Sequence, residues 1–467
     1  MGPFETTELT RDAATRRSGL YRPFARVLHR VLLLVLAIPA ACAAYQLQPL
    51  PVIDLESDPI AVPVQELIAH ERLSPAPIDL TIPLSDLDLA RLMLVTSPEM
   101  AALRSRVDVA EAQLFAAGIL PDPQLSLSIA KGSASGLVTG LAAGLAFDFG
   151  ALLSAQPRRA AARANAGQIR HDVAWSEWLA INQVRTLVVR IQNLSRQRQI
   201  VAPALQSARE ILLLTRTNLA RGDARIDDSS LSLVAFLDAQ DRAQALARSL
   251  ASARLELNAS VGVLPATVIK LKAVDPNPHQ LQAPLELTRR ALDARLDLIA
   301  LREGYQAHEQ NLRTTFLLSV PLPQLALSRD RDTSAIWTTG AAAAISLPLW
   351  NRNRGDIAVA RATRTQLAAE YQARVHQMRA DIAALIVELD AIEEARSALA
   401  TELPELRTAS AILAAASLAG DVSRLSFETV RAALLDKELS SLALELSFAE
   451  NSVALETAVG EFLWEVQ

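Results

Sequence analysis

Glu388, Asp390, Glu393 and Glu394 are the side chains of this 467-residue chain whose types and spacing first suggest chemistry. Paired carboxylates act as general acid and base when they face a common substrate. These four lie among Arg and Ala in a helix-like stretch, where a run of charge is usually a solvated helix face. The six His residues are scattered, and the sequence contains no nucleophile motif and no phosphate-binding Gly loop. We therefore expect neither an enzyme nor a bound cofactor.

Composition excludes several other classes of protein. With 46 Lys and Arg against 51 Asp and Glu, the net charge of −5 leaves no basic excess to neutralise phosphates, so no nucleic-acid partner is expected. A hydrophobic fraction of 51% excludes a disordered chain, and a single Cys excludes a disulfide framework. The low aromatic fraction (4%), together with abundant Ala, Leu, Arg and Glu, favours long helices.

Cys42, the only cysteine, follows a segment typical of a secretory signal. Five Arg residues between positions 16 and 30 precede the apolar run 31–38, which is followed by Pro39 and small residues. The run is shorter than the ~20 apolar residues of a membrane-spanning helix, so we interpret 1–41 as a signal peptide. Ala40-Ala41-Cys42 resembles a bacterial lipobox, which would make Cys42 a lipid attachment point. Pro39 stands where that motif usually has Leu, and ordinary signal cleavage at Ala41-Cys42-Ala43 is the alternative.

Four landmarks recur in the same order about 200 residues apart, which indicates a duplicated unit. Their separations are 198, 200, 201 and 198 residues. The pairs are Leu87–Arg91 with Leu285–Arg289, Pro121–Ser128 with Pro321–Ser328, Pro203–Leu212 with Pro404–Leu413, and Gly222-Asp223 with Gly420-Asp421. We place the two copies at residues 84–265 and 280–465, after an arm at 42–83.

Each copy predicts the same order of elements. A helical region (85–117 and 284–315) leads to two short strands (124–131 with 141–149, and 316–328 with 335–349). A long helix follows (158–220 and 355–419), and a turn connects it to a returning helix (229–261 and 426–465). In the first copy we expect a helix break near Thr96, because Ser97-Pro98-Glu99 is typical of a new helix start.

The expected fold is mostly α with a small β part. A helix of ~60 residues is about 90 Å long, which suits extended coiled-coil packing rather than a compact core. The first strand, Gln124–Ile129, alternates polar and apolar residues. Four strands leave open edges that a membrane does not tolerate, so several copies must share one barrel if the strands lie in lipid.

This duplicated order resembles the TolC-like outer-membrane factor family over about Ser85 to Phe462. Three features carry the resemblance: the segment Leu347–Ala362, the strand starts Pro121-x-Pro123 and Pro321-x-Pro323, and the turns at Gly222 and Gly420. The family implies a homotrimer in the outer membrane of a Gram-negative bacterium, with one shared twelve-stranded β-barrel in lipid. Its helices form a periplasmic tunnel, closed at the tip until a periplasmic adaptor and an inner-membrane efflux pump engage it.

Two segments refine this resemblance. The arm 42–83 contains seven Pro after Tyr45 and resembles the extended N-terminal arm of the lipoprotein members, and a plain disordered linker is the alternative. The stretch Asn351–Gly355 resembles the branch that partners heavy-metal cation pumps, while drug efflux and type I secretion stay open. The chain has 6 His, 4 Met and 1 Cys without a ligand cluster, so metal selection would belong to the pump or the adaptor.

The turns between the paired long helices are the candidate functional positions. A Gly able to take positive φ suits such a turn, and the Asp after it suits a helix cap. The resemblance implies that the turns also dock the adaptor and narrow the tunnel. Family members often carry acidic side chains just after the second turn, which form a cation-attracting ring; the matching positions here include Ser426 and Thr429, with Glu428 nearby, and Asp227 and Asp228 of the first copy are the alternative source of the ring. The candidates are Gly222, Asp223, Asp227 and Asp228 in the first copy, and Gly420, Asp421 and Glu428 in the second.

Aromatic residues offer a further pattern. Five lie around the predicted strands, where they suit either a membrane interface or ordinary packing: Phe147, Phe149, Phe316, Trp337 and Trp350. Trp175 and Trp178 share a helix face and are expected to pack. The rival interpretation of the whole chain is a periplasmic coiled-coil scaffold or adaptor-like protein without a membrane barrel, and insertion of the strands into lipid distinguishes the two.

Overall fold

The computed structural model describes residues 45–50, 82–273, 283–347, 349–419, 421–422 and 424–464. The chain divides into two units, Met1–Ser57 and Asp58–Gln467, and only 45–50 of the first is described, as an exposed stretch without regular structure. The predicted signal peptide, Cys42 and most of the arm lie outside the described residues. The elements below all belong to the second unit.

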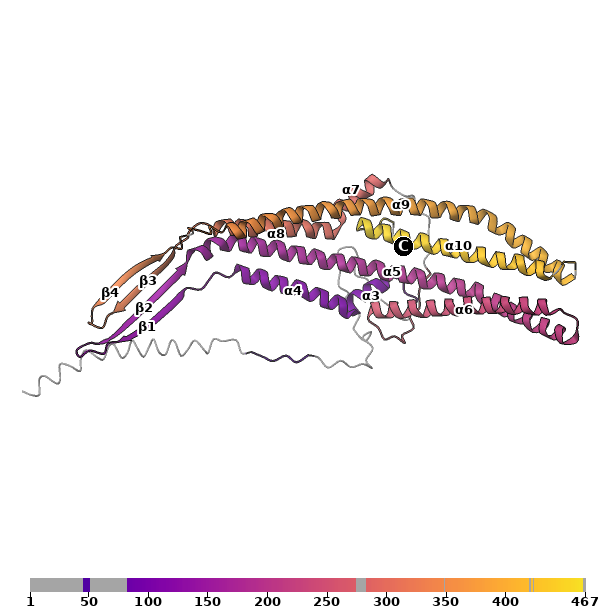
Figure 1. Cartoon of the computed structure of the whole chain (residues 1–467), viewed down its shortest axis with the longest axis horizontal. Helices are drawn as coiled ribbons and strands as arrows, with labels where there is room; N and C mark the ends of the chain where they lie inside the picture. Colours follow the sequence, from indigo (N-terminus) through magenta and orange to yellow (C-terminus); the bar gives the residue numbers. More distant parts are fainter. Residues whose placement is uncertain are drawn as a thin grey trace, which may run out of the picture. The chain divides into compact units, whose positions relative to one another are not determined.

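The second unit contains one order of elements twice: two helices, two strands and two long helices (Figure 1). The elements of the first copy are α3 (Asp86–Thr96), α4 (Pro98–Gly118), β1 (Gln124–Lys131), β2 (Thr139–Asp148), α5 (Phe149–Arg221) and α6 (Ile226–Val261). Those of the second copy are α7 (Pro284–Ala294), α8 (Leu296–Leu317), β3 (Gln324–Arg331), β4 (Trp337–Ala344), α9 (Arg354–Ala419) and α10 (Arg424–Val459). The order of elements predicted from the duplicated sequence is confirmed.

The long helices α5 and α9 contain 73 and 66 residues. At 1.5 Å per residue they are about 110 and 100 Å long. The α5 helix begins nine residues before the predicted start at 158, because the Asp148 carboxylate caps it by accepting a hydrogen bond from the Ala151 N–H at 3.0 Å. Pro157 consequently lies inside the helix and does not precede it.

Both copies interrupt their first helix, although the sequence predicted only the break at Ser97. The second break falls at Arg295, 198 residues later, where the backbone is extended (φ −69°, ψ 117°). In each copy the last helix ends at a glycine with positive φ that packs against the break: Gly262 beside Thr96 and Ser97, and Gly460 beside Arg295. A Cβ on Gly262 would lie 2.7 Å from the Thr96 carbonyl oxygen, so the close approach requires glycine.

The four strands form one antiparallel sheet in the order β1-β2-β3-β4. The β1 strand agrees with its prediction, whereas β3 begins at Gln324 and not at 316. The α8 helix continues to Leu317, and Pro321 and Pro323 have no N–H to donate to a ladder. The β4 strand is also shorter than predicted, covering Trp337–Ala344.

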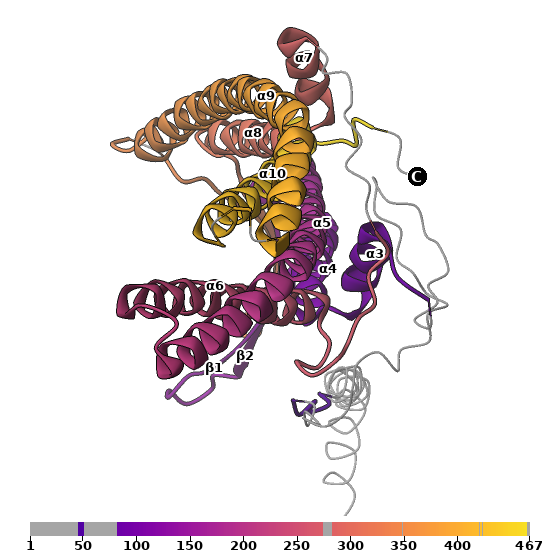
Figure 2. The same ribbon diagram turned by 90° about the vertical axis from the view of Figure 1, so that its right-hand side faces the viewer.

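Each copy has its own hydrophobic core between its helices. In the first copy Leu89, Met93, Ile181, Leu187 and Leu257 join α3, α5 and α6. In the second, Leu287, Leu298, Met378, Ile382 and Leu455 join α7, α8, α9 and α10. Figure 2 shows α5 with α6 as one helix pair and α9 with α10 as the other. None of the helices in the described ranges is both long and apolar enough to cross a bilayer.

Candidate functional site

One face of the four-stranded sheet is lined by small and polar side chains. The cross-strand register places Ser126 opposite Gly144, Gly144 opposite Ser328, and Ser328 opposite Gly340. The rows on either side consist of the same kinds of residue: Gln124, Ala146, Ala326 and Ala342 in one, and Ser128, Ala142, Asp330 and Thr338 in the other. The Ser328 hydroxyl donates a hydrogen bond to the Asp330 carboxylate at 2.9 Å. We call this the polar face.

The opposite face is apolar and exposed. One row contains Leu125, Leu145, Leu327 and Ala341, and the neighbouring rows contain Leu127, Ile129, Leu141, Phe147 and Leu325. Ile129 is 75% exposed and Leu125 64% exposed, although both are large apolar side chains. Basic side chains lie on the same face: Arg329 shares the row of Leu127, Arg331 shares the row of Ile129 and Leu141 and is opposite Trp337, and Lys131 ends β1. The Arg329 guanidinium lies 5.2 Å from the centre of the Trp337 ring.

The sheet has two open edges in the described chain. The β1 strand pairs only with β2, and β4 pairs only with β3. A sheet with two exposed faces and two free edges does not bury its apolar side chains within one copy. The described residues leave both edges and both faces of the sheet uncovered.

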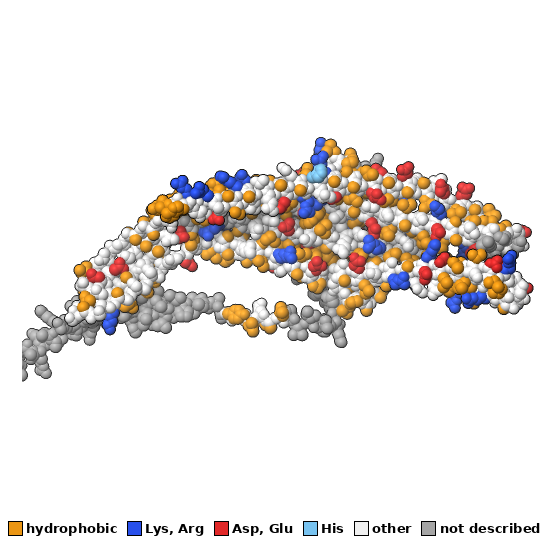
Figure 3. Space-filling view, in the orientation of Figure 1, with side chains coloured by type: hydrophobic (Ala, Val, Ile, Leu, Met, Phe, Trp, Pro, Cys, Tyr) orange, Lys and Arg blue, Asp and Glu red, His pale blue; other side chains and the backbone are white. Residues whose placement is uncertain are grey.

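Of the five aromatic residues predicted around the strands, four lie where the sheet meets the helices, whereas Trp337 lies at the β3–β4 hairpin. Phe147, Phe149 and Phe316 are exposed, and Trp350 is 83% exposed. Figure 3 shows apolar side chains grouped at this junction.

The turn between α5 and α6 brings four of the candidate residues into one loop. Gly222 ends α5 with φ 84°, and the Asp223 N–H donates to the Asn218 carbonyl at 2.8 Å. Asp223 thus completes the end of α5, and Asp228 caps α6 by accepting from the Arg225 N–H at 3.3 Å. Asp227 remains 66% exposed, and its carboxylate lies 3.4 Å from the Arg225 guanidinium. The side chain of Asp223, whose backbone N–H makes the bond to Asn218, is exposed like that of Asp227.

The second turn is described only in part, because Gly420 lies outside the described residues. Asp421 is exposed, and its N–H donates to the Ala416 carbonyl at 2.9 Å. Glu428 lies one turn into α10, 3.8 Å from Arg431, whose guanidinium hydrogen-bonds the Ser207 hydroxyl of α5. Glu428 is therefore placed beside the α5–α10 contact, and within the described ranges it makes no ion pair or hydrogen bond to the first turn.

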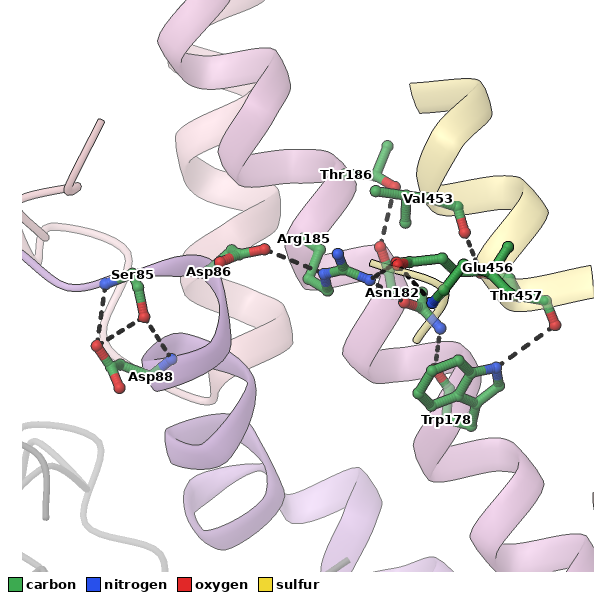
Figure 4. Close-up of polar contacts among 11 residues, drawn as sticks. Ser85, Asp86, Asp88, Trp178, Asn182, Arg185, Thr186, Val453, Glu456 and Thr457 are labelled. Atoms are coloured by element: carbon green, nitrogen blue, oxygen red, sulfur yellow. Dashed lines mark hydrogen bonds and ion pairs between the residues drawn. The ribbon is translucent and has the colours of Figure 1, made fainter. Parts of the chain in front are cut away.

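A buried polar cluster joins the two copies in the middle of the helices (Figure 4). Arg185 of α5 lies 2.5 Å from Glu456 of α10 and 3.0 Å from Asp86 of α3. Burial lowers the pKa of Arg185, but the carboxylates of Glu456 and Asp86 outweigh it and hold that pKa above its ordinary value. The Arg185 guanidinium also lies 5.0 Å from the centre of the Phe462 ring, which packs edge-on against buried Trp178.

A second charged cluster surrounds the helix break at Arg295. Two nitrogens of Arg295 contact the two carboxylate oxygens of Asp297 at 2.9 and 2.8 Å, and a third bonds to the Ala458 carbonyl at 3.0 Å. The Arg295 guanidinium lies 4.7 Å from the centre of the Trp175 ring. Nearby on α5, burial raises the pKa of Asp172, as does Asp297, against the opposing effects of the Gln168 hydrogen bond and His171.

Sequence reasoning found the packing role of the tryptophans but missed both clusters. The available signal was a lone charge inside a mostly apolar helical stretch, as with Arg185 in 184–189 and Glu456 in 453–459. The described residues contain no group of His, Cys, Asp or Glu arranged to hold a metal ion. The acidic run Glu388–Glu394 lies on α9, where Glu393 pairs with Arg396 at 2.9 Å, as expected of a helix face.

Comparison with solved structures identifies the fold. The chain superposes on CusC, described in connection with transmembrane channel formation, with a TM-score of 0.66 and 17% identity over 85% of this chain and 97% of CusC. It superposes on the outer-membrane protein VceC of Vibrio cholerae with a TM-score of 0.67 and 16% identity, over 82% of this chain and 100% of VceC. The MtrE outer-membrane channel of Neisseria gonorrhoeae superposes with a TM-score of 0.65 and 16% identity, over 86% of this chain and 96% of MtrE.

The likeness lies in structure and not in sequence. No protein-family model matches the chain, and no curated protein matches it. The fold is that of the TolC-like outer-membrane channels, as the sequence resemblance implied. CusC and MtrE are described as channels, and VceC as an outer-membrane protein.

Proposed function

We propose that the chain is one subunit of a homotrimeric outer-membrane channel in a tripartite efflux system. Three copies would contribute four strands each to a shared barrel, and the long helices would extend it as a tunnel into the periplasm. Passage through this duct is passive, since the energy for export belongs to the partner pump.

The sheet carries this proposal. Its polar face suits a water-filled lumen and its apolar face suits lipid, because successive residues along each strand of a membrane barrel face these two surroundings in turn. The free edges of β1 and β4 give each copy a place to pair with its neighbours. The exposed aromatic residues at the junction with the helices suit a membrane interface.

The helix turns are proposed as the docking positions for a periplasmic adaptor that recruits an inner-membrane pump. Gly222 and Asp223 are exposed just after α5, Asp227 and Asp228 are exposed in the first turn of α6, and Asp421 is exposed just after α9. Gly420 and Glu428 complete the proposed tip. Cys42 is proposed as the lipid attachment point that anchors the N-terminal arm in the outer membrane.

Metal cations are the substrate class that we propose to test first, because the stretch Asn351–Gly355 resembles the heavy-metal branch. The test is deletion of the gene, followed by growth on copper, zinc, cobalt and a panel of drugs. Sensitivity to the metals supports the substrate class, and sensitivity to drugs alone contradicts it.

The channel itself is tested by fractionation and conductance. We expect the full-length protein in the outer-membrane fraction, as a trimer that dissociates on heating in gel electrophoresis. The purified trimer should give discrete ion-conducting steps in a planar lipid bilayer. A water-soluble protein that gives no conductance would favour the periplasmic scaffold instead.

A further inference from the structure

Six exposed arginines lie where the long helices begin, next to the sheet. They are Arg158, Arg159 and Arg163 of α5, and Arg352, Arg354 and Arg361 at the start of α9. We call them the arginine belt. Figure 3 shows Lys and Arg side chains gathered over the beginning of α9, beside the apolar group at the junction with the sheet.

Both copies place these arginines at the same level. Arg159 lies beside Gly118, the last residue of α4, and the Arg361 guanidinium lies 5.3 Å from the ring of Phe316, near the end of α8. Gly118 and Phe316 are 198 residues apart, the separation that relates the two copies. The belt therefore belongs to the duplicated unit.

Local charge in the belt is strongly positive within a chain of net charge −5. Residues 149–171 contain four Arg and no Asp or Glu, and residues 350–369 contain four Arg and one acidic residue, Asp356. The nearby Asp148 is engaged in capping α5. Such an excess of one sign attracts a ligand of the opposite sign.

Carboxylates of the described chain do not neutralise the belt. None of the six arginines forms an ion pair within the described ranges, although neighbouring Arg364 pairs with Glu309 at 3.5 Å and Arg170 with Glu111 at 3.2 Å. Arg158 donates instead to the Ala151 carbonyl at 2.6 Å, and Arg354 to the Trp350 carbonyl at 3.0 Å. These bonds hold the side chains near the sheet while leaving their charge uncompensated.

Exposed apolar side chains lie immediately on the sheet side of the belt. Leu152 and Leu153 precede Arg158, and Leu349 and Trp350 precede Arg352, and all four are exposed. A band of apolar residues that ends in Trp and then in basic residues matches the change from lipid tails to headgroups. Free anions would account for the arginines but not for the apolar neighbours.

We propose that the arginine belt binds the phosphorylated headgroups of anionic lipids in the leaflet from which the helices emerge. The proposal rests on the proposed membrane trimer and adds a lipid partner to it. Guanidinium groups suit this role because they bind phosphate oxygens through paired N–H donors. Bound lipid would fix the depth of the channel in its membrane.

The test measures lipid retained by the full-length trimer in neutral detergent, titrated with phosphatidylglycerol or phosphatidylcholine and analysed by native mass spectrometry. The test variant replaces all six belt arginines with Gln. A control variant replaces six exposed arginines farther along the helices with Gln: Arg209, Arg216, Arg221, Arg248, Arg254 and Arg379. Both variants lose the same charge, and both keep Lys131, Arg329 and Arg331 at the far end of the sheet.

We expect the wild type and the control variant to prefer phosphatidylglycerol, and the belt variant to bind it about tenfold more weakly, with the preference falling as salt rises. A variant with Lys at all six positions should retain the preference and shows that charge is the cause. Equal binding by the belt variant and the control, or displacement of lipid by millimolar inorganic phosphate, contradicts the proposal.

Loss of the fold and failure of the proposed function are both recognisable. If the variant with all six substitutions does not assemble, a variant with only Arg352, Arg354 and Arg361 replaced by Gln is measured. Unchanged lipid binding by that variant contradicts the proposal. A wild-type protein that forms no membrane trimer contradicts the proposed function. A conducting trimer that shows no preference for anionic lipid contradicts only the proposal that the arginine belt binds lipid.

Discussion

Arg185 and Glu456 join the two copies of the repeat through a buried ion pair, with Nη1 of Arg185 2.5 Å from Oε2 of Glu456. Arg185 belongs to α5 of the first copy and Glu456 to α10 of the second. The second oxygen of Glu456 accepts a hydrogen bond from the Leu463 N–H at 3.1 Å, so the same carboxylate also fixes the chain after α10. Each charge depends on the other, because water does not reach either of them freely.

Replacing Arg185 with Met should therefore be strongly destabilising. It leaves the Glu456 carboxylate buried without its cation, which costs about 3–5 kcal/mol of unfolding free energy. The measurement is the thermal unfolding of the detergent-solubilised protein, followed by circular dichroism at 222 nm. Arg190→Gln is the matched control, because Arg190 pairs with Glu450 across the same two helices but is 42% exposed. We expect that control to cost at most ~1 kcal/mol. Similar losses in the two variants would contradict the importance of the buried pair.

Gly222→Ala should destabilise the turn between α5 and α6. Gly222 has φ 84°, a conformation that costs an L-residue about 1–2 kcal/mol. Gly355→Ala is the control, because Gly355 lies in the first turn of α9 with open space around its Cα. There the change should be neutral or stabilise by up to ~1 kcal/mol. Urea-induced unfolding of both variants measures the difference, and an equal response would show that the turn does not constrain the backbone.

Asp227 and Asp228 are adjacent but should respond differently to substitution with Asn. Asp228→Asn weakens the cap of α6 and should cost about 0.5 kcal/mol, with little effect on conductance. Asp227→Asn leaves the helix intact and removes an exposed carboxylate. If Asp227 attracts cations at the tunnel mouth, its variant should lower the ratio of cation to anion permeability in bilayer recordings. An unchanged ratio would exclude Asp227 from the ring.

Asp172 should make stability depend on pH. Because burial raises its folded-state pKa, the folded protein binds a proton more tightly than the unfolded chain. Stability should therefore fall as pH rises from the unfolded value of 3.8 through the raised folded value, and stay level above it. Asp172→Asn should remove this decline and slightly raise the melting temperature at neutral pH, since the side chain is partly exposed. Glu388→Gln on α9 is the control, and an identical pH profile for wild type and Asp172→Asn would contradict the assignment.

Duplication made most of the fold predictable from sequence. Landmarks spaced by about 200 residues gave both copies the same elements, and the alternation in Gln124–Ile129 gave β1 its bounds. The break at Arg295 was missed because it has no Ser-Pro signature like that at Ser97, and its cause lies in tertiary packing against Gly460. The start of α5 was missed because a proline in a long helix resembles a boundary when its packing is unknown.

The candidate site was predictable only where local chemistry determines it. The turn at Gly222 was predictable because glycine tolerates the positive φ that the turn requires. The roles of Asp223 and Asp228 were not separable, because both suit a cap and only the backbone path selects one. The partnership of Arg185 with Glu456 joins residues 271 positions apart, which no local pattern encodes.

The central claim is that the sheet has one face in lipid and the other in a water-filled lumen. It is tested most directly by single substitutions to Cys at Ser126, Leu127, Ser128 and Ile129 of β1, in a protein whose Cys42 is replaced. The membrane-embedded trimer is then labelled with a water-soluble maleimide. The account predicts labelling at Ser126 and Ser128 and protection at Leu127 and Ile129, with the protected positions labelled after unfolding in detergent. Equal labelling at all four positions in the membrane would contradict it.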